Sequence, residues 1–256
     1  AIFLSRNNND KKRANIYEKR FYALEKNIYK YLVEKKTGRL VDGIDWDAKQ
    51  VQQNSPHVAA WTILLDLCKE SHGLLEKELL SILAKPMPIR GAPDASPVIP
   101  SPFFIYYIYE ALKKRGKGDA VIDNIRRWLA WLPENDFTTC FEHWPYADLN
   151  KEKGDTSYCH AWSAHPVVHF ANIILGVNQT APAWRKIEFS PSFSFFDHAC
   201  GTIPTPYGTI KVAWRKNNEY ININLDIPEK INAKILLPKI SKIVKGGKYK
   251  WVIYRS

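Results

Sequence analysis

Cysteine is scarce in this sequence and lacks the spacing of a structural cysteine framework. The four cysteines stand far apart along the 256 residues: Cys68, Cys140, Cys159 and Cys200. Disulfide frameworks and zinc sites both use short, paired spacings, so neither is expected to organise this chain. Cys140 and Cys159 can approach one another in the fold, although buried free thiols are the favoured interpretation. Neither a metal nor a cofactor is predicted.

Long apolar runs are also missing. No stretch is long enough to span a membrane, so no membrane partner is predicted. The apolar run near the N-terminus, Ile2-Phe3-Leu4, is far too short for a signal peptide. The compartment stays open, because periplasmic, extracellular and cytoplasmic locations are all compatible with this sequence.

Acidic residues are fewer than basic ones. The 26 Asp and Glu stand against 37 Lys and Arg, which gives a net charge of +11. Such a surplus is typical of proteins that bind nucleic acids. The basic clusters at 11–13 and 113–115, however, fall at a helix start and a helix end, where solvated charged turns are common. The sequence has no RNA-binding signature, zinc-finger spacing or basic zipper. No nucleic-acid partner is predicted, and a basic nucleic-acid binder remains as an alternative.

Helical patterning dominates the first two thirds of the chain. Apolar residues recur at helical spacing, and capping or breaking residues separate the runs. The pattern predicts six helices: 11–36, one opening at Ser55-Pro56, one near 72–84, one from Ser101-Pro102 to Gly116, one from Asp119 to just before Pro133, and one from Pro166 to Gly176. Five prolines make 86–100 an irregular loop.

After Gly176 the apolar residues alternate with polar ones. The clearest run is 221–227, and shorter runs occur at 210–214 and 249–253. Alternation of this kind predicts strands with one buried face, here in an antiparallel β-sandwich. The predicted domains are therefore 1–177, which is helical, and 178–256, which is the sandwich. The fold class is mainly α with a β tail.

Six helices taken in pairs make about three helical hairpins, which are too few to close a six-hairpin (α/α)6 toroid. The helix after Pro102 carries Phe103, Phe104 and Tyr107 among its apolar residues and is apolar on several faces. A helix of that kind needs neighbours on several sides. We expect a partial toroid whose remaining helices lie outside this chain. A compact bundle covered by the β domain is the alternative.

One carboxylate lies in an aromatic segment at 137–144. Glu142 stands beside Phe141 and close to Trp144. Such surroundings can tune the pKa of a carboxyl group, and aromatic walls suit the face of a sugar ring. Glu142 is therefore a candidate catalytic residue and Trp144 a candidate sugar contact. The alternative is a surface glutamate in an aromatic loop.

A second candidate segment, 157–166, precedes the last predicted helix. His160 can hydrogen-bond a sugar hydroxyl, and Trp162 can stack on a ring. The alternative is a histidine that only caps the helix or packs in the core. Further along, His165 and His169 are four residues apart and can share a helix face, but no third ligand completes a metal site.

A third cluster combines Asp42, Asp45 and Asp47 with Trp46. Glycoside hydrolysis requires two carboxyl groups, so these residues can in principle supply the acid. Their loop setting favours ordinary solvated carboxylates.

Taken in order, these motifs resemble the bacterial α-L-rhamnosidases of glycoside hydrolase family 78. The segment Thr138–Trp144 is similar to the Thr-Thr-x-Trp-Glu segment of the family, with Phe141 in place of the usual Trp. Ser157–Trp162 resembles its Ser-x-x-His-Ala-Trp segment, and the runs 181–187 and 201–212 resemble its C-terminal β domain. Gln53 and His57 are similar to a Ser-Gln-His helix start.

The resemblance implies an (α/α)6 barrel, an inverting mechanism and a carbohydrate substrate that carries terminal α-L-rhamnose. It implies that Glu142 is the general base and that His160 contacts the sugar. The general acid of the family lies in an upstream motif that has no counterpart in this sequence. We therefore expect the C-terminal part of a bacterial enzyme, inactive without its N-terminal half. The alternatives are a fucosidase-like six-hairpin glycosidase and a non-catalytic carbohydrate-binding or structural module.

Overall fold

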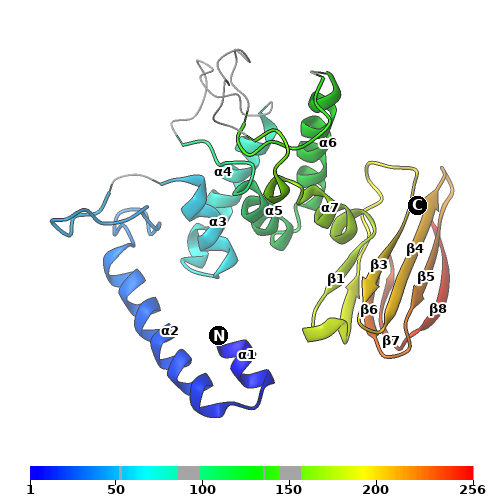
Figure 1. Ribbon diagram of the computed structural model, residues 1–256, viewed down its shortest axis with the longest axis horizontal. Coiled ribbons are helices and arrows are strands. Elements are labelled where there is room, and N and C mark those ends of the chain that lie inside the picture. The colour runs from blue at the N-terminus through cyan, green and yellow to red at the C-terminus, as the bar shows by residue number, and fades with distance from the viewer. Residues whose placement is uncertain (52–53, 86–97, 135, 145–156, 256) are drawn as a thin grey trace. The chain divides into compact units, whose positions relative to one another are not determined.

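The computed structural model describes residues 1–51, 54–85, 98–134, 136–144 and 157–255. The chain divides into two compact units, of which the first comprises 1–81 with 96–100 and the second 82–95 with 101–256. The α-helices of the described residues are α1 (Ile2–Asn7), α2 (Lys11–Tyr31), α3 (Pro56–Leu64), α4 (His72–Ala84), α5 (Ile105–Lys114), α6 (Gly118–Glu134) and α7 (Pro166–His169) (Figure 1). None of the described helices combines the length and apolar character needed to cross a membrane.

Local capping explains where the helices of the first unit begin. The side chain of Asp10 accepts a hydrogen bond from the Arg13 backbone at the start of α2, and Ser55 does the same for Val58 at the start of α3. The predicted start of α3 at Ser55-Pro56 is confirmed. A small core of this unit gathers on residues from α2, α3 and the loops beside them: Leu40, Leu67, Cys68, Ile28, Leu32, Val33 and Val58.

The prediction that the first helix extends to residue 36 is wrong. Helix α2 ends at Tyr31, and Val33 then pairs with Leu40 in an antiparallel bridge. Leu32 and Val33 fit the helical period, but Leu32 is the C-cap of α2 and Val33 lies in the bridge, and both pack against the small core. The short helix α1 was not predicted, because six residues carry too little periodicity to be recognised.

Helices α5 and α6 form the buried centre of the second unit. The hydroxyl group of Tyr109 donates a hydrogen bond to Asn124 across this pair at 2.6 Å, and Asn124 in turn donates to the carbonyl of Leu83 at 3.0 Å. The prediction that the fifth helix ends before Pro133 is wrong, because α6 continues to Glu134 with Pro133 in its last turn. A proline there costs one backbone hydrogen bond close to the helix end, where little helix remains to be broken.

Helix α7 continues directly into a π-helical segment, η4 (Phe170–Ile174), and the helical region stops at Gly176. Gly176 has a φ of +74°, which is the left-handed conformation that glycine adopts without strain. The site is also crowded, since a Cβ added to Gly176 would lie 2.1 Å from the backbone nitrogen of Pro191. The predicted stop at Gly176 therefore has two physical causes.

We expect Gly176→Ala to destabilise the protein by about 3 kcal/mol or more, since the new methyl group meets both a disfavoured φ and a backbone clash. Gly116→Ala is the matched control. Gly116 has nearly the same φ, +73°, but no atom lies within 4 Å of the added Cβ. Its cost should stay near 1 kcal/mol, from the φ alone. Urea unfolding of the two variants measures the difference, and equal losses would contradict the clash.

Two four-stranded sheets follow the helices, in the orders β1-β2-β6-β7 and β3-β4-β5-β8. The strands are β1 (Val177–Gln179), β2 (Lys186–Phe189), β3 (His198–Thr205), β4 (Gly208–Lys216), β5 (Tyr220–Ile227), β6 (Asn232–Leu237), β7 (Ile240–Val244) and β8 (Gly247–Tyr254). Strands β2 and β6 pair in parallel, whereas the other neighbours pair in antiparallel fashion. The prediction of a wholly antiparallel sandwich is wrong for β2 and β6. Alternation of apolar and polar residues indicates which face of a strand is buried, but it does not indicate whether the neighbouring strand runs parallel or antiparallel.

The two sheets bury their alternating apolar residues against one another. On β5, Ile221, Ile223, Leu225 and Ile227 are all buried, as the alternation predicted. The rings of Phe189 on β2 and Trp251 on β8 stack across the sheets with their centres 6.3 Å apart. The sandwich is fixed to the helices, since the indole of Trp214 donates to the carbonyl of Ile174 at 2.9 Å. A helical region followed by a β-sandwich is therefore confirmed.

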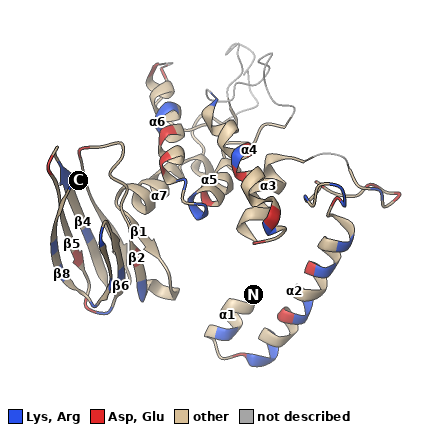
Figure 2. Cartoon of the chain, turned by 180° about the vertical axis from the view of Figure 1, so that it is seen from behind, with Lys and Arg blue, Asp and Glu red and all other residues tan. Residues whose placement is uncertain are grey.

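Charge is distributed widely over both units. Figure 2 shows basic and acidic residues together along α2 and along α6, and again among the strands. Several are paired, such as Arg39 with Glu78 at 2.7 Å and Arg127 with Asp123 at 3.0 Å. Most of the positive surplus lies in the sandwich region, because residues 178–256 hold 13 Lys and Arg against 5 Asp and Glu.

Candidate functional site

The two candidate segments of the sequence lie side by side in the second unit. The backbone N–H of Glu142 donates to the carbonyl of Ser157 at 2.9 Å, and the N–H of His160 donates to the carbonyl of Cys140 at 2.9 Å. The hydroxyl of Thr139 also donates to the carbonyl of Tyr158. These bonds tie the segments 139–142 and 157–160 together, so residues far apart in the sequence become neighbours.

The carboxylate of Glu142 is held at the edge of this pairing. Its side chain is 27% exposed, and Oε2 accepts a hydrogen bond from the backbone N–H of Ser157 at 3.3 Å. Oε1 lies 3.8 Å from Nε2 of His143. The carboxylate is thus fixed in orientation by the backbone yet accessible to a water molecule, which are the two properties that a general base needs.

His160 and Trp162 form a stacked pair next to Glu142. The two rings lie 4.0 Å apart at an angle of 29°, and the backbone N–H of Trp162 donates to Nδ1 of His160 at 3.4 Å. Because Nδ1 accepts that bond, Nε2 carries the proton of the neutral ring and is available as a donor. The indole N–H of Trp162 donates to the backbone carbonyl of Glu142 at 3.3 Å. Glu142, His160 and Trp162 therefore lie next to one another.

Trp144 has a different setting. It is only 4% exposed, and its ring packs edge-on against Trp128 with the centres 5.1 Å apart. Its ring therefore supports the segment of Glu142 from the interior. A direct contact between Trp144 and a sugar stays a prediction.

A cluster of aromatic rings supports both segments. The ring of Phe137 contacts Phe141 at 4.5 Å and stacks on Tyr158 at 5.8 Å. The hydroxyl of Ser163 adds a hydrogen bond to the carbonyl of Phe141. Tyr158 stands two residues before His160 in the sequence, so it belongs to the second candidate segment. Its contact with the ring of Phe137 cannot be predicted from sequence spacing.

The aspartates of the third cluster serve their own loop in the first unit. Oδ1 of Asp42 accepts from the backbone N–H of Ser55 at 2.8 Å, and Oδ1 of Asp45 accepts from the N–H groups of Asp47 and Lys49 at 3.0 and 2.8 Å. Trp46 is fully exposed. The contacts of Asp45 are those of a turn-forming acid, and the contact of Asp42 holds the residue that precedes α3.

The helix start that included Gln53 and His57 is described only in part. Gln53 lies outside the described residues. Burial lowers the pKa of His57, and the negative charge of Asp42 opposes that shift. His57 lies in the first unit and stands at the beginning of α3.

His169 is fully buried in the second unit, and His165, whose ring contacts it, is partly buried. Nε2 of His165 donates to the carbonyl of Pro102 at 3.0 Å, and the ring of His169 is in edge-on contact with Tyr109 at 5.1 Å. Burial lowers the pKa of His165 to about 4 and that of His169 to about 3. Within the described ranges, no three His, Cys, Asp or Glu side chains are arranged to hold a metal ion.

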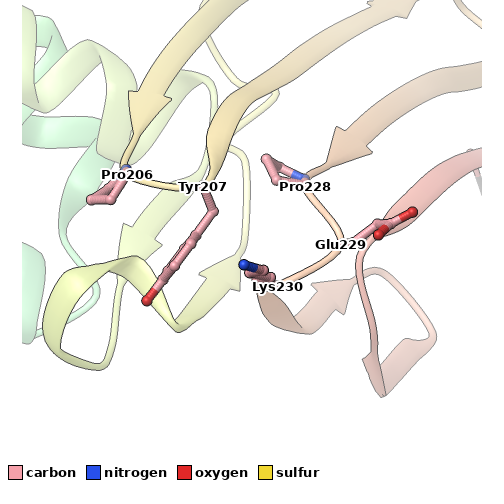
Figure 3. A pocket seen from close by; sticks show the side chains of 5 residues that line it. All are labelled: Pro206, Tyr207, Pro228, Glu229 and Lys230. Carbon is pink, nitrogen blue, oxygen red and sulfur yellow. The ribbon is translucent and has the colours of Figure 1, made fainter.

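The sandwich carries a shallow pocket of about 420 Å³ that the sequence analysis did not predict. It is lined by Pro206, Tyr207, Pro228, Glu229 and Lys230 (Figure 3). The hydroxyl of Tyr207 accepts a hydrogen bond from Arg185 at 3.3 Å, and the carboxylate of Glu229 points away from Tyr207. The pocket shares no residue with the site around Glu142.

Three comparisons show which known proteins the chain is similar to. Residues 176–250 match the family described as the bacterial alpha-L-rhamnosidase C-terminal domain. Over 143 residues, 53% of the chain, the sequence is 27% identical to the alpha-L-rhamnosidase of Alteromonas sp. (strain LOR). A crystal structure of the GH78 family rhamnosidase of Bacillus sp. GL1 superposes on 92% of the chain with a TM-score of 0.73 and 27% identity. An α-L-rhamnosidase from Aspergillus terreus superposes on 98% with a TM-score of 0.73 and 19% identity.

These matches make the chain similar to glycoside hydrolases. More specifically, it is related to the C-terminal part of the α-L-rhamnosidases, so the predicted resemblance is confirmed. The chain spans 16% of the Alteromonas protein and 24% of the Bacillus protein. Most of each of those enzymes therefore has no counterpart in this chain.

Proposed function

We propose that this chain is the C-terminal portion of an inverting glycoside hydrolase that releases terminal α-L-rhamnose from glycosides or polysaccharides. Glu142 acts as the general base, His160 and Trp162 contact the sugar, and the buried ring of Trp144 supports the segment that carries Glu142. The observation that carries the proposal is that Trp162 stacks on His160 and donates its indole N–H to the backbone carbonyl of Glu142, which brings the three residues together. The similarity to α-L-rhamnosidases supplies the substrate class.

Each residue has a defined part in this mechanism. The Ser157 N–H holds Oε2 of Glu142, so the carboxylate is positioned to remove a proton from water as the water attacks the anomeric carbon. Nε2 of His160 donates a hydrogen bond to a sugar hydroxyl, and Trp162 packs on the ring. Inversion requires a second carboxyl group about 6.5–9.5 Å from the first, which protonates the leaving oxygen. We propose that this acid belongs to the part of the enzyme that precedes the chain.

The same missing part would complete the barrel. We propose that 1–177 contributes about three hairpins of an (α/α)6 toroid and that 178–256 is the β-sandwich domain. Helices α1 and α2 expose many large apolar side chains: Phe3, Leu4, Ile16, Phe21, Tyr22, Leu24, Tyr29 and Tyr31. A soluble domain rarely leaves so many apolar groups in water, so a covering partner is expected. The N-terminal half of the same enzyme is the partner that we propose.

The test compares this chain with a longer polypeptide that includes the preceding region. The longer protein should hydrolyse an aryl α-L-rhamnoside and release the β-anomer first, as followed by NMR, whereas the chain alone should give no turnover. Preference for an aryl fucoside would favour another six-hairpin glycosidase. Sugar binding by calorimetry without turnover, even in the longer protein, would favour a carbohydrate-binding module. Inverting turnover by the chain alone would mean that the acid lies within it, with Asp42, Asp45 and Asp47 as candidates.

The role of Trp162 gives a separate prediction. Trp162 is 40% exposed, and its ring contacts His160 and Phe103, whose ring centres lie 4.0 and 5.5 Å away. In the active protein, Trp162→Ala should raise KM for the rhamnoside about tenfold, the loss of roughly 1.4 kcal/mol of stacking. Trp162→Phe keeps a ring and should recover most of that affinity. Equal KM values for the two variants would contradict stacking by Trp162.

A further inference from the structure

Two cysteines lie on the two hydrogen-bonded segments of the candidate site, one on each. Backbone hydrogen bonds flank them on both sides, from Glu142 to Ser157 and from His160 to Cys140, each at 2.9 Å. The N–H that donates to the carbonyl of Cys140 belongs to the residue directly after Cys159, so the two cysteines stand on adjoining stretches of backbone. A disulfide spans Cα atoms roughly 4.4–6.8 Å apart, which is the range typical of neighbouring hydrogen-bonded segments. Cys140 and Cys159 are therefore candidates for a bridge.

The two thiols differ in a way that suits stepwise reaction. Cys159 is exposed, whereas Cys140 is half-buried. Burial raises the pKa of Cys140, and the nearby Cys159 raises it further, which agrees with the closeness of the two sulfurs. An oxidant from solution therefore reaches Cys159 first, and Cys140 lies behind it as the resolving thiol.

We propose that Cys140 and Cys159 are a redox-sensitive pair that closes into a reversible disulfide across the candidate site. A low-molecular-weight disulfide such as oxidised glutathione is the oxidant. The thiolate of Cys159 attacks one of its sulfurs and releases one glutathione thiol. The thiolate of Cys140 then attacks the sulfur of Cys159 and releases the second. Two protein thiols and one glutathione disulfide thus become one protein disulfide and two glutathione thiols.

The bridge would join the segment of Glu142 covalently to the segment of His160. It would close a loop in the chain between residues 140 and 159, in addition to the hydrogen bonds that already connect its ends. The inference does not depend on the proposed hydrolase activity, because the bridge is detected by mass and not by turnover.

The test treats the reduced protein with oxidised glutathione, alkylates the remaining thiols and maps the peptides by mass spectrometry without reduction. Two of the four cysteines should lose their label together, with a peptide pair linked through Cys140 and Cys159 that is lighter by two hydrogens. Dithiothreitol should restore both labels. In Cys159→Ser, Cys140 should stay labelled.

Cys200→Ser is the matched control, because Cys200 is also exposed but stands on β3. The bridge should form unchanged in this variant. A stable glutathione adduct on Cys159 with Cys140 still labelled would overturn the proposal. So would a bridge that uses Cys200 or Cys68.

Discussion

Replacing Glu142 with Gln in the active, longer polypeptide is expected to lower kcat by about 10²–10⁴-fold, because the amide cannot take a proton from the attacking water. Folding should be retained. The amide oxygen can still accept the hydrogen bond from the Ser157 backbone, and the backbone bond between Glu142 and Ser157 does not involve the side chain. Steady-state hydrolysis of an aryl rhamnoside and urea unfolding measure the two quantities separately.

Two further measurements distinguish a general base from a residue that only supports the loop. Azide attacks the anomeric carbon without needing to lose a proton, so it should restore turnover in Glu142→Gln and yield the glycosyl azide. Glu188→Gln is the matched control, because Glu188 is paired with Lys234 on the sandwich and lies outside the site. Near-normal hydrolysis by Glu142→Gln would refute the role of Glu142 as the base.

The parts of the fold that local sequence patterns determine were predicted correctly. Ser55 caps α3, Gly176 ends the helical region, and alternating residues of β5 face the core, each for a reason that acts within a few residues. Helix ends that depend on distant contacts were predicted less well. The end of α2 depends on the bridge between Val33 and Leu40, which no helical period can report.

The candidate site shows the same division. Its residue types stood out in two short runs, but their closeness depends on backbone hydrogen bonds between segments that are far apart in the sequence, such as Glu142 with Ser157. Spacing also could not distinguish the buried ring of Trp144 from the half-exposed ring of Trp162, because burial is decided by neighbours such as Trp128. The resemblance to the α-L-rhamnosidases predicts a role for each of these residues, and the structure shows which of the residues are in contact.

The buried histidines should make the protein sensitive to mild acid. His165 and His169 have folded-state pKa values of about 4 and about 3, below the unfolded value near 6.5. The unfolded chain therefore binds more protons below pH 6.5. The stability associated with the neutral rings is complete above that pH and is lost progressively as the pH falls toward 4 and 3. Two such groups should remove about 4 kcal/mol of unfolding free energy between pH 7 and pH 5.

The surroundings of His165 and His169 explain why their imidazole rings stay neutral. His169 is completely buried, and neither of its ring nitrogens has a hydrogen-bond partner among the described residues. Its Nδ1 lies 3.6 Å from a Glu110 oxygen, but Glu110 is already paired with Lys113 at 2.7 Å, and the charge of Lys113 disfavours a second cation. Tyr106 and Tyr109 contact His169 through their aromatic rings. A proton on His169 would thus be poorly compensated.

Removing one histidine should therefore halve the effect. His169→Phe keeps a ring of similar size between Tyr106 and Tyr109, leaves no unpaired nitrogen and should reduce the loss between pH 7 and pH 5 to about 2 kcal/mol. The exposed histidine of β3 provides the control, and His198→Ala should leave the pH dependence unchanged. Urea unfolding at a series of pH values measures all three proteins. An unchanged slope in His169→Phe would mean that the acid sensitivity comes from other groups, because a buried neutral histidine must take up its proton when the chain unfolds.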